Sequence, residues 1–427
     1  MKMALQQSRW KQLLTLGLCA GLVSSCSLMR LKHEVKKLNE RGVVAIHTTP
    51  VPGDAPIYAL AWPANTRLTN EMVGFQKVAP DGNAIFLLLQ SRKYDIGVFE
   101  DRNGNGTYEG GEPAALAREV QPTPINDPTV KAKTIELVLT TTNLAVPRGQ
   151  TLKMPQENQE LGEALPIRIG DLADLDDPKF AATVGELGMW QPFVFLQQHG
   201  FAIYFLEEYD PKKMPVLFVY GISGSFQDWR SIVEKLDRKK YQPWLFLYPS
   251  GFRLEKTANT LAAMLVLSKQ RYQFEQIAVV AHSMGGLVSR GAIQRVVKQS
   301  GTNFIPEFVT IATPWGGHEA AQMGVKYLEY PVPSWRDMAP GSDYLKIVTE
   351  TPLPPGTRHD LIFGFKTSGG MGMPNDNDGV VGVESELVVS VQQQAASVFG
   401  LPLDHTEILS SPLVLKKIET VLGASPR

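Results

Sequence analysis

The segment that predicts the fold is Gln276-Ile-Ala-Val-Val-Ala281-His282-Ser283-Met284-Gly285-Gly286-Leu-Val-Ser-Arg290. Its apolar run up to Ala281 is typical of a buried strand, and the residues from Gly285 onward are typical of a helix. A nucleophilic serine on the sharp turn between a strand and a helix needs small residues two before and two after it. Ala281 and Gly285 meet this need, so we interpret Ser283 as a nucleophile at the positive end of a helix. An ordinary turn serine is the alternative.

From residue 213 to residue 427, strand-like runs alternate with amphipathic helices. The runs are VLFVYG, WLFLYPS, IAVVAH, FVTIATP, LIFGFK and VVGVES, and the expected helices include 226–239, 257–271 and 285–299. Such alternation predicts an α/β fold with a mostly parallel sheet covered by helices on both faces. A final helix closes the chain.

The excursion at about 315–358 interrupts this alternation with Trp315, Tyr327, Tyr330, Trp335 and several prolines. We interpret it as a cap, which serves either as a lid over the acyl site or as a small core of its own. A glycine-rich segment at 369–373 is a second candidate for lining the pocket.

A serine attacks a carbonyl when a base takes its proton and backbone donors hold the oxyanion. Among the histidines after Ser283, only His405 lies beyond the late strands and just before a final helix. Because the order with such a turn is serine, acid, histidine, we expect His405 to be the base. The first strand ends at Gly221, so the expected oxyanion donors are the amides of Ile222 and of Met284.

The candidates for the acid are Asp376 and Asp378, which lie between two strand-like runs, and more weakly Asp337. The acid would hold the His405 ring in the useful tautomer and stabilise the imidazolium. His282 leaves the turn in a different direction from Ser283, so we interpret it as a structural filler.

Two further histidines follow the elbow. His359 opens a strand and is interpreted as structural. His318 lies in the PWGGH loop and is a candidate for substrate contact.

Six segments resemble the lipase-related branch of the α/β-hydrolases over residues about 213–425. In chain order they are VLFVYGISGS, VVAHSMGGLVSR, TIATPWGG, SWRDMAPGSDYL, NDNDGVVGVES and DHTEIL. The resemblance implies a serine hydrolase of lipase or carboxylesterase type. It favours Asp378 as the acid, because Asp378 precedes Gly-Val-Val as in lipase acid loops. Tyr220 stands where the family has histidine.

The N-terminus has the pattern of an export signal. Lys2, Arg9 and Lys11 precede the short apolar run LLTLGLCAGLV. Val23-Ser-Ser-Cys26 then resembles the bacterial lipobox, in which the cysteine is lipidated and becomes N-terminal. We therefore expect a signal peptide at 1–25, a lipid anchor on Cys26 and a location in the outer membrane of the cell envelope. A conventional signal peptide with an incidental cysteine is the alternative.

Residues 26–41, with five basic residues in the stretch 29–41, are interpreted as a tether. A solvated stalk is the favoured interpretation, and contact with anionic lipid is the alternative.

Residues 42–140 contain short β-rich runs separated by Pro-Gly, Asp-Gly and Asn-Gly turns. This texture predicts an all-β, sandwich-like accessory domain. Within it, Asp101, Asn103, Asn105 and Glu112 fit the spacing of a calcium loop, although the segment follows a strand and not a helix. A structural Ca²⁺ is one interpretation, and a plain Asn-Gly hairpin turn is the favoured one.

Charge and cysteine content exclude some classes of function. The net charge of −1 lacks the basic surplus expected of a nucleic-acid-binding protein. Both cysteines, Cys19 and Cys26, precede the folded body, which excludes a disulfide framework or a cysteine nucleophile there. Residues 141–212 form a connector with edge elements of the second domain.

These patterns predict hydrolysis of an acyl ester or lipid-like substrate through an acyl-enzyme on Ser283, without a cofactor for catalysis. Two other functions stay open. One is an acyltransferase with the same triad, and the other is a non-catalytic envelope binding protein on a degenerate hydrolase scaffold.

Overall fold

The computed structural model describes residues 25–49, 55–66, 68, 72–79, 82–125, 133–140, 144, 146, 151–153, 165–365 and 376–424. The expected signal peptide, up to residue 24, and the glycine-rich segment at 369–373 lie outside these residues. The chain divides into a larger unit, Met1–Val35, Arg168–Phe195 and Phe201–Arg427, and a smaller unit, Lys36–Ile167 and Leu196–Gly200.

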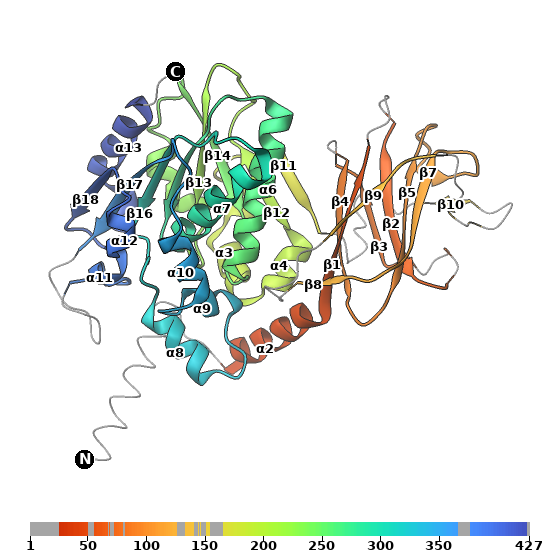
Figure 1. The fold of residues 1–427 in the computed structure, drawn as a ribbon, viewed down its shortest axis with the longest axis horizontal. Coiled ribbons are helices and arrows are strands. Elements are labelled where there is room, and N and C mark those ends of the chain that lie inside the picture. The colour runs from red at the N-terminus through yellow and green to blue at the C-terminus, as the bar shows by residue number, and fades with distance from the viewer. Residues whose placement is uncertain are drawn as a thin grey trace, which may run out of the picture. The chain divides into compact units, whose positions relative to one another are not determined.

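The smaller unit contains two four-stranded sheets (Figure 1). In one sheet β1 pairs with β4, β8 and β9, and in the other the order is β3-β2-β5-β7. The bounds are β1 Arg41–Thr48, β2 Ile57–Pro63, β3 Gly74–Lys77, β4 Asn83–Leu89, β5 Tyr94–Glu100, β6 Thr107–Tyr108, β7 Ala114–Val120, β8 Thr123–Pro124, β9 Thr134–Leu137 and β10 Leu152–Lys153.

Alternating side chains of both sheets build one core in this unit. Ile46 of β1 and Phe86 of β4 belong to the same buried cluster as Ala61 of β2 and Ile96 of β5. Two sheets that share an inner core form a sandwich. The expected all-β sandwich is therefore confirmed.

Helix α2 (Ser25–Glu40) occupies the segment that was expected to be a solvated tether. Leu31 and Leu38 on this helix are fully buried. The carboxylate of Glu34 accepts the backbone N–H of Val194 at 3.0 Å. The stalk interpretation is therefore wrong, because one side of the helix is packed.

The larger unit is built on an eight-stranded sheet of order β11-β12-β14-β13-β15-β16-β17-β18. Apart from the antiparallel pair β12–β14, the strands from β14 to β18 run parallel. The bounds are β11 Ile167–Leu172, β12 Phe201–Phe205, β13 Met214–Val219, β14 Tyr241–Leu247, β15 Ala278–His282, β16 Glu307–Ile311, β17 Arg358–Gly364 and β18 Ser397–Leu401.

Helices cover both faces of this sheet, which confirms the predicted fold class. Right-handed crossovers place α5 on one face and α6 and α7 on the other, and α6 packs along α7. The bounds are η1 Pro178–Phe180, α3 Ala182–Trp190, α4 Pro192–Gln198, η2 Phe226–Trp229, α5 Arg230–Val233, α6 Leu254–Tyr272, α7 Met284–Ser300, α11 Val383–Glu386, α12 Val389–Gln392, η3 Glu407–Ser410 and α13 Pro412–Ala424.

Two elements differ from the sequence expectation. The run VVGVES is not a strand, because its first residues form a turn and α11 follows from Val383. The last strand is instead β18, which pairs with β17 at the sheet edge. The expected helix 226–239 is also shorter and consists of η2 and α5.

The excursion contains α8 (Glu319–Tyr327), α9 (Pro333–Met338) and α10 (Asp343–Glu350). Arg290 of α7 donates to the carbonyls of Val348 and Thr351 at the end of α10. Gln294, one turn further along α7, donates to the same two carbonyls. These bonds satisfy the open end of α10 and fix it to α7.

Buried polar contacts fix α9 as well. The guanidinium of Arg253 binds both carboxylate oxygens of Asp337, which also accepts the N–H of Leu254 at 2.7 Å. Trp315 and Trp335 are buried against the rest of the larger unit, where Trp315 lies against His359 of β17 and Trp335 against Trp190 of α3. Tyr327 at the end of α8 is exposed.

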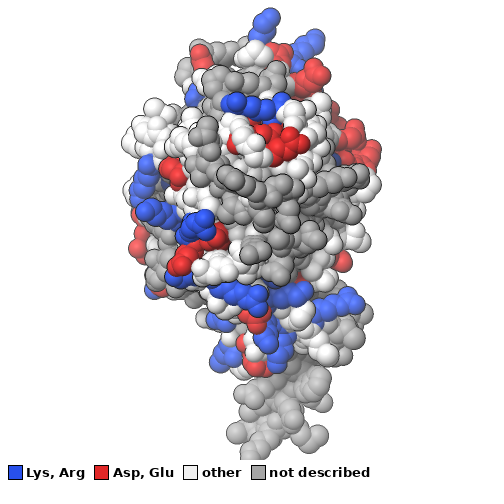
Figure 2. Space-filling view, turned by 90° about the vertical axis from the view of Figure 1, so that its right-hand side faces the viewer, with Lys and Arg blue, Asp and Glu red and all other residues white. Residues whose placement is uncertain are grey.

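On the face drawn in Figure 2, basic and acidic side chains are interspersed. Within the described ranges, the structure contains no helix with the length and apolar character needed to cross a bilayer.

Candidate active site

Ser283 lies between β15 and α7, on the turn that the sequence predicts. Its φ of 54° and ψ of −133° are unusual for a residue with a side chain and mark a strained backbone. Its N–H donates to the carbonyl of Ile311 at 2.8 Å, which joins the turn to β16. The hydroxyl makes no capping bond to α7. The turn thus presents Ser283 at the carboxyl edge of the parallel strands.

Two glycines permit this turn. A Cβ on Gly285 would lie 2.4 Å from the carbonyl oxygen of Tyr220, and a Cβ on Gly221 would lie 2.6 Å from the Cβ of Ser283. Neither approach is compatible with a side chain. The loop after β13 therefore lies directly against Ser283, as an oxyanion loop requires.

The amides of Ile222 and Met284 flank this contact. Met284 is the first residue of α7, where a backbone N–H has no acceptor in its own helix. Among the described residues, no acceptor pairs with the N–H of Ile222. Both amides are therefore available to a ligand oxygen.

Tyr220, the residue before Gly221, is bonded to Tyr248 in both directions. The Tyr220 hydroxyl donates to the Tyr248 carbonyl at 2.5 Å and accepts the Tyr248 N–H at 2.9 Å. In return, the Tyr248 hydroxyl donates to the Tyr220 carbonyl at 2.6 Å. The two rings stack with their centroids 4.7 Å apart. Burial raises the pKa of Tyr220, so its hydroxyl stays neutral and works as a structural clamp.

Asp378 lies in the loop after β17 and is fully buried. One carboxylate oxygen accepts the N–H groups of Val380 at 2.9 Å and Val381 at 2.7 Å, and the other contacts Nδ1 of His405. Burial alone would oppose ionisation. The hydrogen bond and charge of His405, with the two amides, outweigh it and hold the pKa of Asp378 below its usual value.

His405 lies between β18 and η3, in a turn in which Asp404 accepts the N–H groups of Thr406 and Glu407. The backbone N–H of His405 donates to the backbone carbonyl of Asp378 at 2.9 Å. Because ionised Asp378 only accepts, Nδ1 of His405 carries the proton and Nε2 is left as the basic nitrogen. The residue is held to Asp378 through both backbone and side chain.

His282 has a more specific structural role than the sequence predicted, where it was interpreted as a filler. Its Nε2 lies 2.8 Å from the carbonyl oxygen of His405, and the two rings are 4.7 Å apart. Burial, and then the neighbouring charge of His405, lower the pKa of His282 to about 3. A neutral His282 therefore donates from Nε2 and supports the backbone of His405 beside Ser283.

Glu386 of α11 was not singled out from the sequence. It is fully buried, accepts the N–H of Gly364 at 3.4 Å and lies within hydrogen-bonding reach of Asp378. Burial, and then the charge of Asp378, raise the pKa of Glu386 well above its usual value. No local sequence signal marks it, because its proximity to Asp378 depends on the path of the chain after Asp378.

The other candidate residues from the sequence lie outside the cluster of Ser283, Asp378 and His405 or next to it. Asp337 is committed to Arg253, and Asp376 is exposed. His359 is buried, stacks on Phe308 and bonds the hydroxyl of Thr310 at 2.8 Å, as expected of a structural residue.

His318 lies close to the acid loop. Its Nδ1 accepts the N–H of Ala320, so Nε2 carries the proton and donates to the carbonyl of Val380 at 2.9 Å. This contact joins the start of α8 to the loop that holds Asp378. Burial lowers the pKa of His318, which keeps it neutral.

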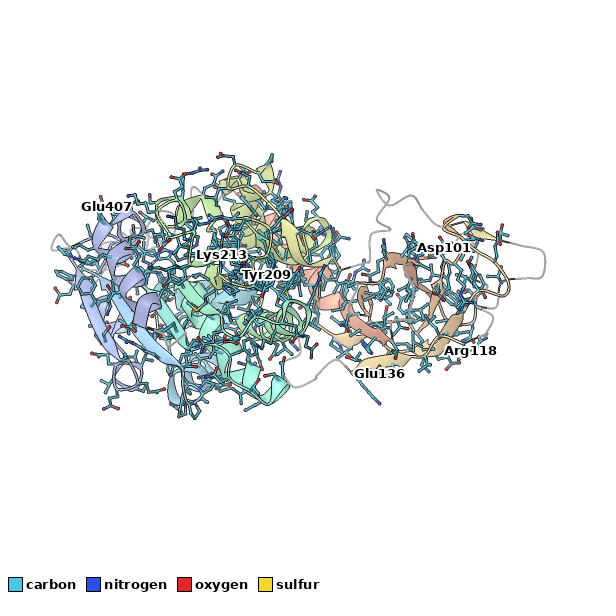
Figure 3. All side chains as sticks on the ribbon, turned by 90° about the horizontal axis from the view of Figure 1, so that it is seen from above. Asp101, Arg118, Glu136, Tyr209, Lys213 and Glu407 are labelled. Atoms are coloured by element: carbon cyan, nitrogen blue, oxygen red, sulfur yellow. The ribbon has the colours of Figure 1, made fainter. Side chains whose placement is uncertain are left out.

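The segment proposed as a calcium loop follows β5, with Asp101 at its start (Figure 3). Asp101 accepts the N–H groups of Asn105 and Gly106, and Asn103 also accepts that of Asn105. Glu112 accepts the N–H groups of Arg102 and Glu109. Across the described ranges, no group of three or more His, Cys, Asp or Glu residues is placed to hold a metal ion. Calcium binding at Asp101–Glu112 stays a prediction.

A mostly parallel sheet with a serine on a strained strand-to-helix turn, followed in the chain by an aspartate and a histidine at the same edge, defines the α/β-hydrolase class. Residues 210–336 match the family model described as "Putative serine esterase (DUF676)". This part of the chain is therefore similar to that family, and its fold is that of the α/β-hydrolases. No curated protein matches the chain.

Several solved structures are similar to the chain at low identity. The lipase BlEst2 of Bacillus licheniformis in its mature form is 19% identical, with a TM-score of 0.40, over 51% of this chain and 94% of that one. Phospholipase PlaB from Legionella pneumophila is 17% identical, with a TM-score of 0.34, over 41% and 45%. The Pyrococcus furiosus esterase PF2001 is 16% identical, with a TM-score of 0.35, over 50% and 81%.

Proposed function

We propose that the protein hydrolyses carboxylic esters through an acyl-enzyme formed on Ser283. The observation that carries this proposal is the double attachment of His405 to Asp378, at the sheet edge where the strained turn presents Ser283. A serine in that position needs a neutral base with a fixed tautomer. The contact with Asp378 fixes the tautomer of His405.

In the first half-reaction the Oγ of Ser283 attacks the ester carbonyl carbon, and its proton passes to Nε2 of His405. The carbonyl oxygen becomes negative and is held by the amides of Ile222 and Met284. When the intermediate collapses, the carbon–oxygen bond to the alcohol breaks, and His405 returns the proton to the leaving oxygen.

In the second half-reaction a water molecule attacks the acyl-serine. His405 takes a proton from the water, the same amides hold the oxyanion, and the proton then returns to Oγ of Ser283. Asp378 stays ionised throughout and stabilises the imidazolium, which agrees with the direction of its pKa. The sum is one ester and one water converted to an acid and an alcohol.

A fluorophosphonate probe tests the nucleophile. We expect stoichiometric labelling of the full chain, complete loss in Ser283→Ala, and no change in Ser300→Ala at the far end of the same helix. A folded protein that takes no label, or keeps its label in Ser283→Ala, would refute the proposal.

Product analysis defines the reaction. With p-nitrophenyl esters of short and long acyl chains, hydrolysis releases free acid. An acyl ester formed with added alcohol in preference to free acid would identify an acyltransferase instead.

The location is part of the same proposal. The lipobox-like Val23–Cys26 segment supports a lipid anchor on Cys26, and an anchored hydrolase would meet acyl lipids as substrates. Labelled palmitate should be incorporated into the wild-type chain and into Cys19→Ser. Incorporation that persists in Cys26→Ser would overturn the anchor.

A further inference from the structure

Three exposed apolar side chains lie on the first turns of α2 and at the end of α8. Leu28 and Met29 of α2 are 37% and 73% exposed, and Tyr327 of α8 is 58% exposed. A hydrophobic side chain with this much exposure is unremarkable alone, but a group of them rimmed by charge marks an interaction surface.

Lys32 links the two helices within the larger unit. Its Nζ lies 3.6 Å from a carboxylate oxygen of Glu329 and 4.8 Å from the ring centre of Tyr330. Leu28 and Met29 precede Lys32 by four and three residues, so they share its face of α2. They therefore lie on the side of α2 that is turned toward the end of α8, and Figure 1 shows these two helix ends side by side.

This part of α2 is held in place. Leu31 is fully buried, and Glu34 accepts the N–H of Val194 in the first turn of α4. A carboxylate at a helix start satisfies an otherwise open amide and favours the positive end of the helix dipole. The exposed residues next to it thus project from a fixed helix.

Basic residues accompany the apolar ones. Lys32 is exposed on the same face of α2 as Leu28 and Met29, and the ammonium of Lys326 lies 5.2 Å from the ring centre of Tyr327. Long basic side chains and tyrosine beside exposed aliphatic groups are the composition that binds at the interface of an anionic bilayer. We define Leu28, Met29, Lys32, Lys326 and Tyr327 as the α2–α8 patch.

We propose that the α2–α8 patch docks on the surface of an anionic phospholipid bilayer. The position of Cys26 selects this occupant, because Leu28 and Met29 lie within one helical turn, about 5 Å, of the residue that we propose to carry the lipid. An acyl chain at that point holds the patch against the headgroups. A protein partner or a second copy would instead have to compete with the bilayer for it.

The docking has a consequence for the site, which rests on the proposed function. Helix α8 has nine residues, a length of roughly 14 Å. Its start is joined through His318 to the loop of Asp378, and its end carries Tyr327 of the patch. The patch therefore places the proposed reaction edge within about one short helix of the membrane, where acyl lipids are the nearest esters.

The test uses the lipidated full chain with Ser283→Ala, so that its outcome does not depend on catalysis. Nitroxide labels are placed at Met29→Cys, at Tyr327→Cys and at the control Leu413→Cys, which is 54% exposed on α13. In vesicles of phosphatidylcholine and phosphatidylglycerol, we expect labels 29 and 327 to be accessible to oxygen and shielded from a water-soluble nickel chelate. Label 413 should show the reverse.

Two results would overturn the proposal. One is a water-like label at 327, which would mean that only the anchor meets the bilayer. The other is shielding of 29 and 327 from both reagents together with spin–spin broadening, which would show that a second copy covers the patch.

Charge reversal gives an independent measurement in the unlipidated full chain, Cys26→Ser. Because each basic residue near an anionic surface adds about fivefold to binding, Lys32→Glu with Lys326→Glu should weaken vesicle binding by at least about 25-fold. The matched control reverses Lys298 and Lys416, two exposed lysines on α7 and α13. An equal loss in the control pair would refute a role for the patch.

Discussion

The Nε2 of His282 lies 2.8 Å from the carbonyl oxygen of His405, so the residue before the proposed nucleophile supports the backbone of the proposed base. This contact links β15 to the loop after β18, two segments that are far apart in sequence. Removal of the donor would leave a buried carbonyl without its partner and free the loop of His405.

We therefore expect His282→Ala to lower kcat by about 10-fold, the equivalent of one lost buried hydrogen bond. His282→Gln keeps an N–H donor at similar reach and should recover most of the activity. Steady-state kinetics on a p-nitrophenyl ester, with melting temperatures as a folding control, measure both. Equal activity of the alanine and glutamine variants would show that the contact has no positioning role.

The acid can be identified with a matched pair of variants. Asp378→Asn should reduce kcat by roughly 10⁴-fold, because a neutral amide neither enforces the Nδ1–H tautomer of His405 nor balances the charge of the imidazolium. Asp376→Asn changes an exposed carboxylate two residues away and should leave kcat within twofold. If Asp376→Asn causes the larger loss, the assignment of Asp378 is wrong.

Glu386 makes the stability of the protein depend on pH. Its pKa is raised in the folded state, so the folded chain holds this proton more tightly than the unfolded chain does. The stability contributed by the proton is complete below the ordinary value of 4.5 and is lost as pH rises toward the raised pKa, by up to about 1.4 kcal/mol per pH unit.

Glu386→Gln cannot ionise and escapes this loss. We expect its melting temperature to exceed that of the wild type by more at pH 8 than at pH 5. Glu384→Gln, an exposed neighbour on the same helix, should show no such trend. A Glu386→Gln difference that is constant between the two pH values would contradict the role of Glu386.

The excursion depends on the pair Arg253–Asp337. Asp337→Asn leaves a largely buried guanidinium without its counter-charge, which should destabilise the protein by roughly 3 kcal/mol. Asp343→Asn on the neighbouring helix is exposed and should cost little. Thermal or urea unfolding compares the two. A neutral effect of Asp337→Asn would show that the excursion does not depend on this pair.

The elbow could be predicted because it depends on a short local pattern, and the acid and base could be predicted because they follow the serine in a fixed order along the chain. The strand expected at VVGVES could not be corrected from sequence, since its three valines are typical of a strand. In the structure, Asp378 binds the N–H groups of Val380 and Val381, which are thereby withdrawn from any sheet ladder. The hydrogen bonds that hold Asp378 therefore override the local preference for a strand.

Strand β18 was missed for the opposite reason. It lies at the sheet edge, and only Leu401 among its residues is buried, so it lacks the apolar run that marks the inner strands. Glu386 and the contact of His282 with His405 likewise arise from how distant segments meet. Patterns in a single sequence carry no information about such contacts.

The clamp between Tyr220 and Tyr248 constrains how this sequence can diverge. A histidine at position 220 would leave the carbonyl and N–H of Tyr248 unmatched, and a phenylalanine at 248 would leave the carbonyl of Tyr220 unmatched. Either exchange alone passes through a damaged intermediate. Positions 220 and 248 are therefore expected to change together. Relatives with histidine at position 220 should also differ from tyrosine at position 248.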